Sequence, residues 1–221
     1  MPISKFNLQP ITKSSTTKER AYNEIKHVIL NGYISSDEIF TEVQLAEFLK
    51  TSRTPVREAL QDLIKEGLIV SIPRKGMTVR KVTENEMEQI FLLRTTIETK
   101  VIQKLTEIIT SEQLALLRAI CKQQEEAMLI NDTIAFIQLD QDFHTALTKF
   151  VDYELIEQML LNLHNLSQLI GLRAIKKSNR MKEVIEEHLA IISSLEFKNS
   201  EQSVIAITNH LSKTKDSVMD N

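Results

Sequence analysis

Three histidines and one aspartate in the later part of the chain have the types and spacing of a metal site. Asp140 and His144 lie four residues apart in AFIQLDQDFHTAL, so both side chains fall on one side of one helix. His188 and His210 occur on two later predicted helices. Such ligands, converging inside a helical bundle, suit a divalent ion such as zinc, nickel or manganese. Histidines are also common as surface or satisfied core groups, so spacing alone leaves both interpretations open.

Three further residues are candidates for binding a small anionic molecule. Arg94, in LLRTTIE, offers a guanidinium fork that can bind a carboxylate, and it is equally placed to pair with Glu98 one turn later. His164 could line the cavity, bond to a metal-bound water, or have no role there. Arg173 is the third candidate, and a solvated charge beside the two lysines of residues 176–177 is the simpler interpretation.

A second group of candidates lies in TSRTPVREAL, residues 51–60, and could contact DNA. Pro55 is compatible with the first turn of a helix that starts at Ser52 or Thr54, because the first backbone N–H groups have no partner inside a helix. Arginine can pair with guanine O6 and N7, and hydroxyl groups reach phosphates or bases. The predicted DNA-binding residues of this helix start are Ser52, Arg53, Thr54 and Arg57.

The order of predicted elements decides between DNA contact and solvated charge for these arginines. In the free protein Arg57 could pair with Glu58 or Asp62. However, the sequence predicts three helices, over 17–31, 41–50 and about 52–66, followed by two β-rich runs, over 68–72 and 77–82. This is the order of elements in a winged helix-turn-helix. The predicted turn of the wing, PRKG, adds three residues that could approach phosphate or the minor groove: Arg74, Lys75 and Gly76.

Charge and composition divide the chain into two modules. Residues 1–81 contain 13 Lys and Arg against 9 Asp and Glu, a net charge of +4, whereas residues 82–221 contain 14 against 21, a net charge of −7. With 4 Gly and 4 Pro in 221 residues, the fold is expected to be mostly α. We predict a flexible N-terminus over 1–16, a winged helix-turn-helix DNA-binding domain over 17–81, and an antiparallel all-helical domain of about six helices over 82–217.

Composition also excludes some classes of protein. The single cysteine, Cys121, excludes an internal disulfide framework. The first ten residues contain no apolar core of a signal peptide, and no apolar stretch approaches the ~20 residues that span a bilayer. We therefore expect a cytoplasmic protein without a membrane partner.

The first module resembles the GntR family of bacterial transcription regulators. The resemblance rests on SRTPVREAL, on the EGL that follows it, and on the basic turn with its glycine. TEVQLAEFL is similar to the family's second helix. The match covers about residues 17–80. The resemblance implies that Arg53, Thr54 and Arg57 read the operator and that Gly76 lies at the tip of the wing. This chain has Val43 where some members carry an arginine, which removes one possible contact.

The second module resembles the FCD-type effector domain of the FadR-like branch of that family. The resemblance rests on three short motifs: D-x-x-F-H at residues 140–144, E-H at 187–188 and H-L at 210–211. The L-R-x-x-x-E around Arg94 is also similar to a motif of that family. The resemblance implies that residues 82–217 form an all-helical effector-binding and dimerisation domain that holds a metal ion and senses a small organic acid. The implied metal ligands are Asp140, His144, His188 and His210, and His164 lies outside the pattern.

We therefore predict a regulator, interpreted as a repressor, that binds a near-palindromic double-stranded operator as a homodimer and responds to a small carboxylate. Two alternatives remain open: a metal-dependent hydrolase, although the chain has no H-E-x-x-H motif, and a helical domain that serves only for dimerisation. The sequence does not identify the effector, the metal, the operator or the regulated genes.

Overall fold

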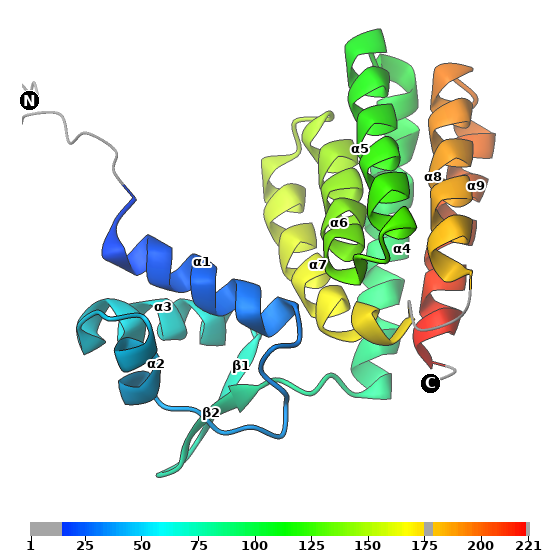
Figure 1. Cartoon of the computed structure of the whole chain (residues 1–221). Helices are drawn as coiled ribbons and strands as arrows, with labels where there is room; N and C mark the ends of the chain where they lie inside the picture. Colours follow the sequence, from blue (N-terminus) through cyan, green and yellow to red (C-terminus); the bar gives the residue numbers. More distant parts are fainter. Residues whose placement is uncertain (1–14, 175–178, 220–221) are drawn as a thin grey trace, which may run out of the picture.

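The chain folds into two groups of elements. The computed structural model describes residues 15–174 and 179–219, without the side chains of 171–174. Figure 1 shows α1, α2, α3 and the β1–β2 hairpin gathered on one side, and a bundle of the helices α4 to α9 on the other. The predicted fold class, a winged helix-turn-helix followed by an antiparallel helical bundle, is confirmed. Within the described residues, no helix is both long and apolar enough to cross a membrane.

The first group has the three helices and the hairpin that the sequence predicts. Their bounds are Thr17–Leu30 for α1, Glu42–Phe48 for α2, Arg53–Lys65 for α3, Ile69–Ile72 for β1 and Gly76–Val79 for β2. Thr16 and Thr41 begin α1 and α2 with capping boxes, in which the threonine oxygen accepts from the third helical N–H. Of the N-terminus predicted to be flexible, residues 1–14 lie outside the described residues.

Helix α3 begins at Arg53, after Ser52 as the N-cap. The first helical residue therefore lies between the two starts that the sequence left open, Ser52 and Thr54, and Pro55 stands at the third helical position, where no intrahelical hydrogen bond is lost. The Ser52 hydroxyl makes no capping hydrogen bond. Spacing of three and four residues places the apolar side chains of α3 on one buried face: Val56, Ala59, Leu60 and Leu63.

The hairpin is shorter than predicted and its glycine has a structural reason. Ile69 pairs with Val79 and Ile72 with Gly76, so the turn is residues 73–75. Gly76 has a φ of +136°, and a Cβ atom there would lie 2.5 Å from the backbone oxygen of Phe40. The close approach of the 39–40 backbone to β2 therefore requires glycine at this position.

The bundle consists of six long helices. They are α4 (Glu84–Ile108), α5 (Ser111–Leu129), α6 (Thr133–Lys149), α7 (Glu154–Ala174), α8 (Arg180–Glu196) and α9 (Ser200–Met219). A central cluster of buried aliphatic side chains from α4, α5, α6, α8 and α9 holds them together, with Ile102, Leu117, Ile191 and Leu211 fully enclosed. Burial of such side chains stabilises the bundle by roughly 1.5–3 kcal/mol each. These helices fix the positions of the histidines predicted from the sequence.

Candidate functional site

The structure brings the four predicted metal ligands together from three helices. Asp140 and His144 come from α6, His188 from α8 and His210 from α9. One potential ligand atom from each lies within 4.8 Å of the others. The three imidazole rings are at most 1% exposed, and Asp140 is partly buried. The spacing in the sequence therefore corresponds to a real cluster in the fold.

Two carboxylates orient the rings of His144 and His210. Nδ1 of His144 lies 2.6 Å from Oε2 of Glu98, and Nδ1 of His210 lies 2.8 Å from Oε2 of Glu187. Burial raises the pKa of Glu98, but Arg94 and His144 outweigh it and hold that pKa well below its usual range. Burial likewise raises the pKa of Glu187, and hydrogen bonds from His210 and Arg180 outweigh it and lower the pKa to about 2. Both carboxylates are therefore ionised acceptors.

Because an ionised carboxylate only accepts, Nδ1 of each ring carries a proton. When both rings are in the neutral form, the Nε2 atoms of His144 and His210 carry lone pairs, and these atoms face each other at 3.0 Å. Burial is the main cause that lowers the pKa of His210, which keeps this ring neutral. Two facing lone pairs with no proton between them are repulsive unless a cation lies beside both.

His188 adds a third lone pair. Its Nδ1 lies 2.8 Å from Oε1 of Gln124, an acceptor, so this ring too carries its proton on Nδ1. Its Nε2 is buried, has no hydrogen-bond partner and lies 3.4 Å from Oδ1 of Asp140. Burial, followed by the neighbouring His210 and His144, holds the pKa of His188 well below its usual range. The ring stacks on Phe143 with centroids 3.9 Å apart, which fixes its plane.

Three imidazole lone pairs and a carboxylate thus converge on one point, and the residues fit a divalent cation of borderline softness. The second nitrogen of each ring is held by a carboxylate or an amide, as is usual for metal-binding histidines. The orphaned Nε2 of His188 is the clearest sign of this fit, because a buried polar atom without a partner is rare.

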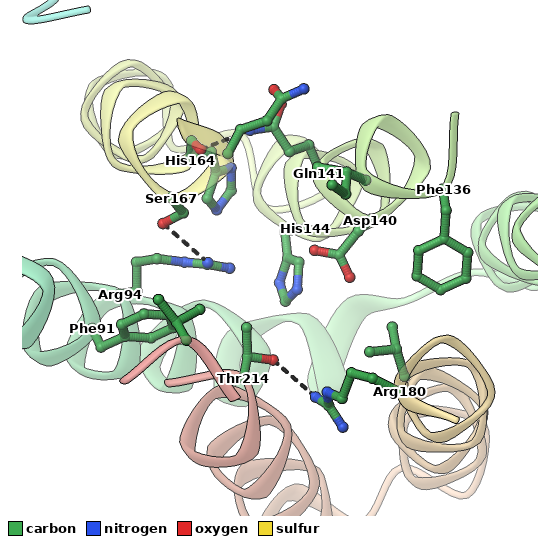
Figure 2. A pocket seen from close by; sticks show the side chains of 14 residues that line it. Phe91, Arg94, Phe136, Asp140, Gln141, His144, His164, Ser167, Arg180 and Thr214 are labelled. Atoms are coloured by element: carbon green, nitrogen blue, oxygen red, sulfur yellow. Dashed lines mark hydrogen bonds between the residues drawn. The ribbon is translucent and has the colours of Figure 1, made fainter. Parts of the chain in front are cut away.

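A cavity of about 60 Å³ adjoins the cluster. By this measure it has room for several water molecules or for a small organic molecule. Figure 2 shows Asp140 and His144 at its centre, Arg94 and His164 on one side and Arg180 on the other. Its apolar lining is Phe91, Phe136, Ile137, Val184 and Val218.

Arg94 forms the ion pair with Glu98 that the sequence predicted as one alternative, and it also lines the cavity. Its Nε donates to Oε1 of Glu98 at 2.8 Å, which is the predicted ion pair, and Nη1 donates to Oγ of Ser167 at 3.3 Å. The same side chain lines the cavity and extends toward His144 (Figure 2). A buried guanidinium that is only partly neutralised by one carboxylate is a suitable partner for an anionic ligand.

His164 also lines the cavity, as one of its three predicted interpretations held. Its Nε2 lies 3.5 Å from Oε1 of Glu98, while its Nδ1 is buried without a partner. Burial, followed by the positive charge of Arg94, lowers the pKa of His164 to about 4, so the ring is neutral at physiological pH. The side chain of Arg173 lies outside the described residues.

Three residues of the site were missed by the sequence analysis. Gln124 and Glu187 hold two of the histidines, and Arg180 binds Glu187 through hydrogen bonds of 2.8 and 3.0 Å. Arg180 also donates to Oγ1 of Thr214 at 3.1 Å (Figure 2). Glu187 directly precedes His188, which was a usable signal. Gln124 and Arg180 lie in no local pattern that distinguishes them from other polar residues.

The predicted DNA-binding residues of α3 lie together at its start. Ser52, Arg53, Thr54 and Arg57 are all exposed. Arg57 makes two hydrogen bonds to Glu42 at the start of α2, from Nη2 at 2.7 Å and from Nε at 2.9 Å. The expected alternative partners, Glu58 and Asp62, are therefore wrong.

The wing turn carries the other three candidates. Arg74 and Lys75 are exposed in the turn, and Arg74 has a φ of +63°. Gly76 begins β2, and its close neighbour in this structure is the backbone of Phe40. The start of α3 thus presents four exposed cationic or hydroxyl-bearing side chains, and the turn presents two exposed basic ones. This placement is typical of a winged helix-turn-helix.

Comparison with protein families assigns both modules. Residues 17–79 match the family described as "Bacterial regulatory proteins, gntR family", and residues 89–213 match the family described as "FCD domain". The chain belongs to the GntR family.

Relatives within the GntR family are similar over most of their length. The Nta operon transcriptional regulator of Aminobacter aminovorans is 30% identical over 185 residues, which cover 83% of this chain and 85% of that protein. The uncharacterized HTH-type regulator YdhC of Bacillus subtilis is 28% identical over 194 residues, 86% of each chain. The gluconate operon transcriptional repressor of B. subtilis is 29% identical over 186 residues, 84% of this chain and 75% of that one.

A solved structure agrees with the fold. E. coli McbR/YncC has a TM-score of 0.83 at 21% identity, and the match covers 94% of this chain and 99% of that one. The family matches and the curated relatives, which are transcription regulators, show that this GntR-family chain is a DNA-binding transcription regulator and not an enzyme. The metal-dependent hydrolase considered from the sequence is wrong, because both family matches and the relatives are regulators.

Proposed function

We propose that this regulator is a repressor that binds a near-palindromic operator as a homodimer and is controlled by a small carboxylate. Residues 17–81 would bind the DNA, and residues 82–217 would hold a divalent metal ion, bind the effector and form the dimer. The observation that carries the proposal is the adjacency of the histidine–aspartate cluster to a cavity that contains Arg94.

The proposed metal ligands are Asp140, His144, His188 and His210. A bound divalent ion would supply positive charge and open coordination positions beside the cavity. Arg94 would bind the effector's carboxylate from the other side, because guanidinium and carboxylate match geometrically. Among the relatives, the gluconate operon repressor of B. subtilis is named for a carboxylate, which supports this class of effector.

The proposed DNA contacts follow from exposure and residue type. Arg53 and Arg57 would read base edges in the major groove, with Thr54 and the uncapped Ser52 hydroxyl on phosphates or bases. Arg74 and Lys75 would approach phosphate or the minor groove from the wing, beside Gly76.

A homodimer is supported by apolar side chains left exposed on α4 and α7, two helices that contact each other. Leu92 is 67% exposed on α4, beside the half-exposed Leu93, and Leu155 and Met159 are 78% and 60% exposed on α7. Large exposed apolar groups on neighbouring elements are typical of subunit interfaces. A dimer would also place two recognition helices in successive major grooves of a two-fold operator.

The metal part of the proposal is tested by metal analysis of the purified protein. We expect about one divalent ion per chain, and its loss in the double variant Asp140→Ala/His188→Ala. His27→Ala is the matched control, because His27 is an exposed histidine of α1. A protein without metal that is also not stabilised by any small carboxylate would instead support a bundle that serves only for dimerisation.

The DNA part is tested by mobility shift with a near-palindromic operator that the purified protein selects from random double-stranded DNA. Arg53→Ala and Arg57→Ala are each expected to weaken specific binding by about 1–3 kcal/mol, whereas Arg118→Ala, an exposed arginine of the bundle, should not. Circular dichroism checks that each variant is folded. Unchanged binding in both α3 variants would contradict the assignment.

A further inference from the structure

Two buried hydrogen-bond acceptors in the cavity have no partner in the protein. Among the buried, described side chains that line this cavity, the unpartnered atoms are Nδ1 of His164 and Oε1 of Gln168. Their residues are 2% and 3% exposed. An unsatisfied buried polar group costs about 1–3 kcal/mol, so such a pair points to a molecule that completes the hydrogen bonding.

The position of the proton on the His164 ring follows from the neighbour of its Nε2 atom. Nε2 faces the ionised Glu98 at 3.5 Å, so the proton of the neutral ring lies on Nε2. Nδ1 is then a lone pair that requires a donor. Gln168 lies one helical turn later on α7, on the same side of the helix, and presents a carbonyl oxygen that also requires a donor.

Three other polar side chains of the cavity donate their hydrogen bonds to backbone oxygens and not to His164 or Gln168. Oγ of Ser167 donates to the backbone oxygen of Leu163 at 2.8 Å, and Nε2 of Gln141 donates to the backbone oxygen of His164 at 2.7 Å. Oγ1 of Thr214 donates to the backbone oxygen of His210 at 2.9 Å. Each of these donors is already engaged elsewhere.

We infer that the effector is a hydroxylated carboxylate, whose hydroxyl groups donate to Nδ1 of His164 and Oε1 of Gln168 while its carboxylate faces Arg94. This inference rests on the proposed carboxylate-binding function and specifies the class of its ligand. An ammonium group could also donate, but Arg94 and Arg180 both line the cavity and disfavour a further buried cation. The cavity of about 60 Å³ restricts the ligand to a short chain.

The test compares carboxylates of equal length that differ in one substituent. Lactate, propionate and alanine share three carbons and one carboxylate, and carry a hydroxyl, a hydrogen and an ammonium at carbon 2. Malate and succinate form the equivalent four-carbon pair. Binding to the full-length protein, as purified with its metal, is measured by calorimetry. We expect each hydroxy acid to bind about tenfold or more tightly than its partner without the hydroxyl, because a receptor with unpaired acceptors rejects such an analogue.

Two variants assign that preference to the named residues rather than to a bound metal. Gln168→Met keeps the length of the side chain and removes the carbonyl acceptor, and His164→Phe removes the ring nitrogen. Because the single hydroxyl of lactate donates one hydrogen bond, the variant that removes its acceptor should reduce the preference for lactate over propionate by about tenfold, with metal content unchanged. Gln158→Met makes the same substitution at an exposed position of α7 and should leave the preference intact.

The outcomes separate this inference from the proposed function. If propionate or alanine binds as tightly as lactate, and succinate as tightly as malate, the carboxylate function stands and the hydroxyl inference is overturned. A preference that persists in both variants overturns the roles of His164 and Gln168. If none of the five acids binds, the proposed function and this inference fail together.

Discussion

His188 shows how neighbouring side chains fix the orientation of one proposed metal ligand. Its Nδ1 donates to Gln124, its ring stacks on Phe143, and its buried Nε2 points a lone pair toward Asp140 without a hydrogen bond. The orientation depends on Gln124, because rotation of the ring would exchange the two nitrogens. Partners of this kind contribute to metal affinity without touching the ion.

Replacing Gln124 should therefore weaken metal binding. We expect Gln124→Met to lower the affinity for the divalent ion by about 10–100-fold, since the buried ring loses the acceptor that fixes its proton and its plane. Affinity is measured by competition with a chromophoric chelator. Gln123→Met, at the exposed neighbouring position of α5, is the control. Equal affinities in the two variants would show that Gln124 does not orient His188.

Residue types and spacing predicted the four clustered ligands because Asp140 and His144 share a helix face and the others lie in short recognisable patterns. The partners that orient the rings could not be predicted in this way. Gln124 and His188 are 64 residues apart, and Glu98 and His144 are 46 apart. Contacts between helices depend on how the helices pack, and helix packing leaves no periodic signal in the chain.

At the scale of elements, the residues that begin helices are the clearest signals of secondary structure in this sequence. Capping boxes at Thr16, Thr41 and Thr83 begin α1, α2 and α4. Each box uses a threonine followed three residues later by Glu or Gln, which can be read directly from sequence. The strands were predicted too long at the end away from the turn, where the pairing stops at Ile69 and Val79, whereas β2 begins one residue earlier than predicted, at Gly76.

The turn between α2 and α3 contains a residue in an unfavourable conformation. Lys50 has a φ of +50° directly after the C-cap of α2, a position where glycine is usual. Lys50→Gly should therefore raise the free energy of unfolding by about 0.5–1 kcal/mol. Lys122→Gly, in the exposed face of α5, should lower it by about 1 kcal/mol. Urea unfolding of both variants without DNA provides the measurement, and a destabilised Lys50→Gly protein would contradict the expectation.

The start of α4 should make stability depend on pH. The backbone hydrogen bond from Thr83, followed by the hydrogen bond from Arg80, lowers the pKa of Glu86 from 4.5 to about 2. Because the folded-state pKa is lowered, the stabilisation is complete above pH 4.5 and is lost as the pH falls toward 2. Glu86→Ala should cost about 1 kcal/mol at pH 7 and less at pH 3.5. A difference in unfolding free energy that is equal at the two pH values would contradict this assignment.

At the scale of the whole molecule, α7 connects the cavity to the DNA-binding module. His164, Ser167 and Gln168 line the cavity from one side of this helix. Its other side contacts the first module: Leu169 packs against the core of α1 and α3, and Nδ2 of Asn165 lies 3.5 Å from Oε2 of Glu66, the C-cap of α3. Figure 1 shows the later part of α7 beside α1.

Glu66 is itself held by α1, through hydrogen bonds from Tyr22 at 2.5 Å and Lys26 at 2.9 Å. A ligand that draws α7 toward the cavity would therefore act on the far end of the recognition helix. Such coupling requires that the effector bind one arrangement of the modules more tightly than another. Through the contacts of Asn165 and Leu169 with the first module, α7 could favour one arrangement of the two modules over another.

Removing those contacts should uncouple sensing from DNA binding without abolishing either. We expect Asn165→Ala/Leu169→Ala to retain effector binding by calorimetry and operator binding by mobility shift, because neither side chain is among the proposed ligands of the metal, the effector or DNA. The effector's influence on operator affinity, expected to be about 5–150-fold as is typical of allosteric coupling, should fall toward none. Gln158→Ala, on the exposed face of α7, should keep the full response. A double variant with an undiminished response would show that the coupling travels through another contact between α7 and the DNA-binding module.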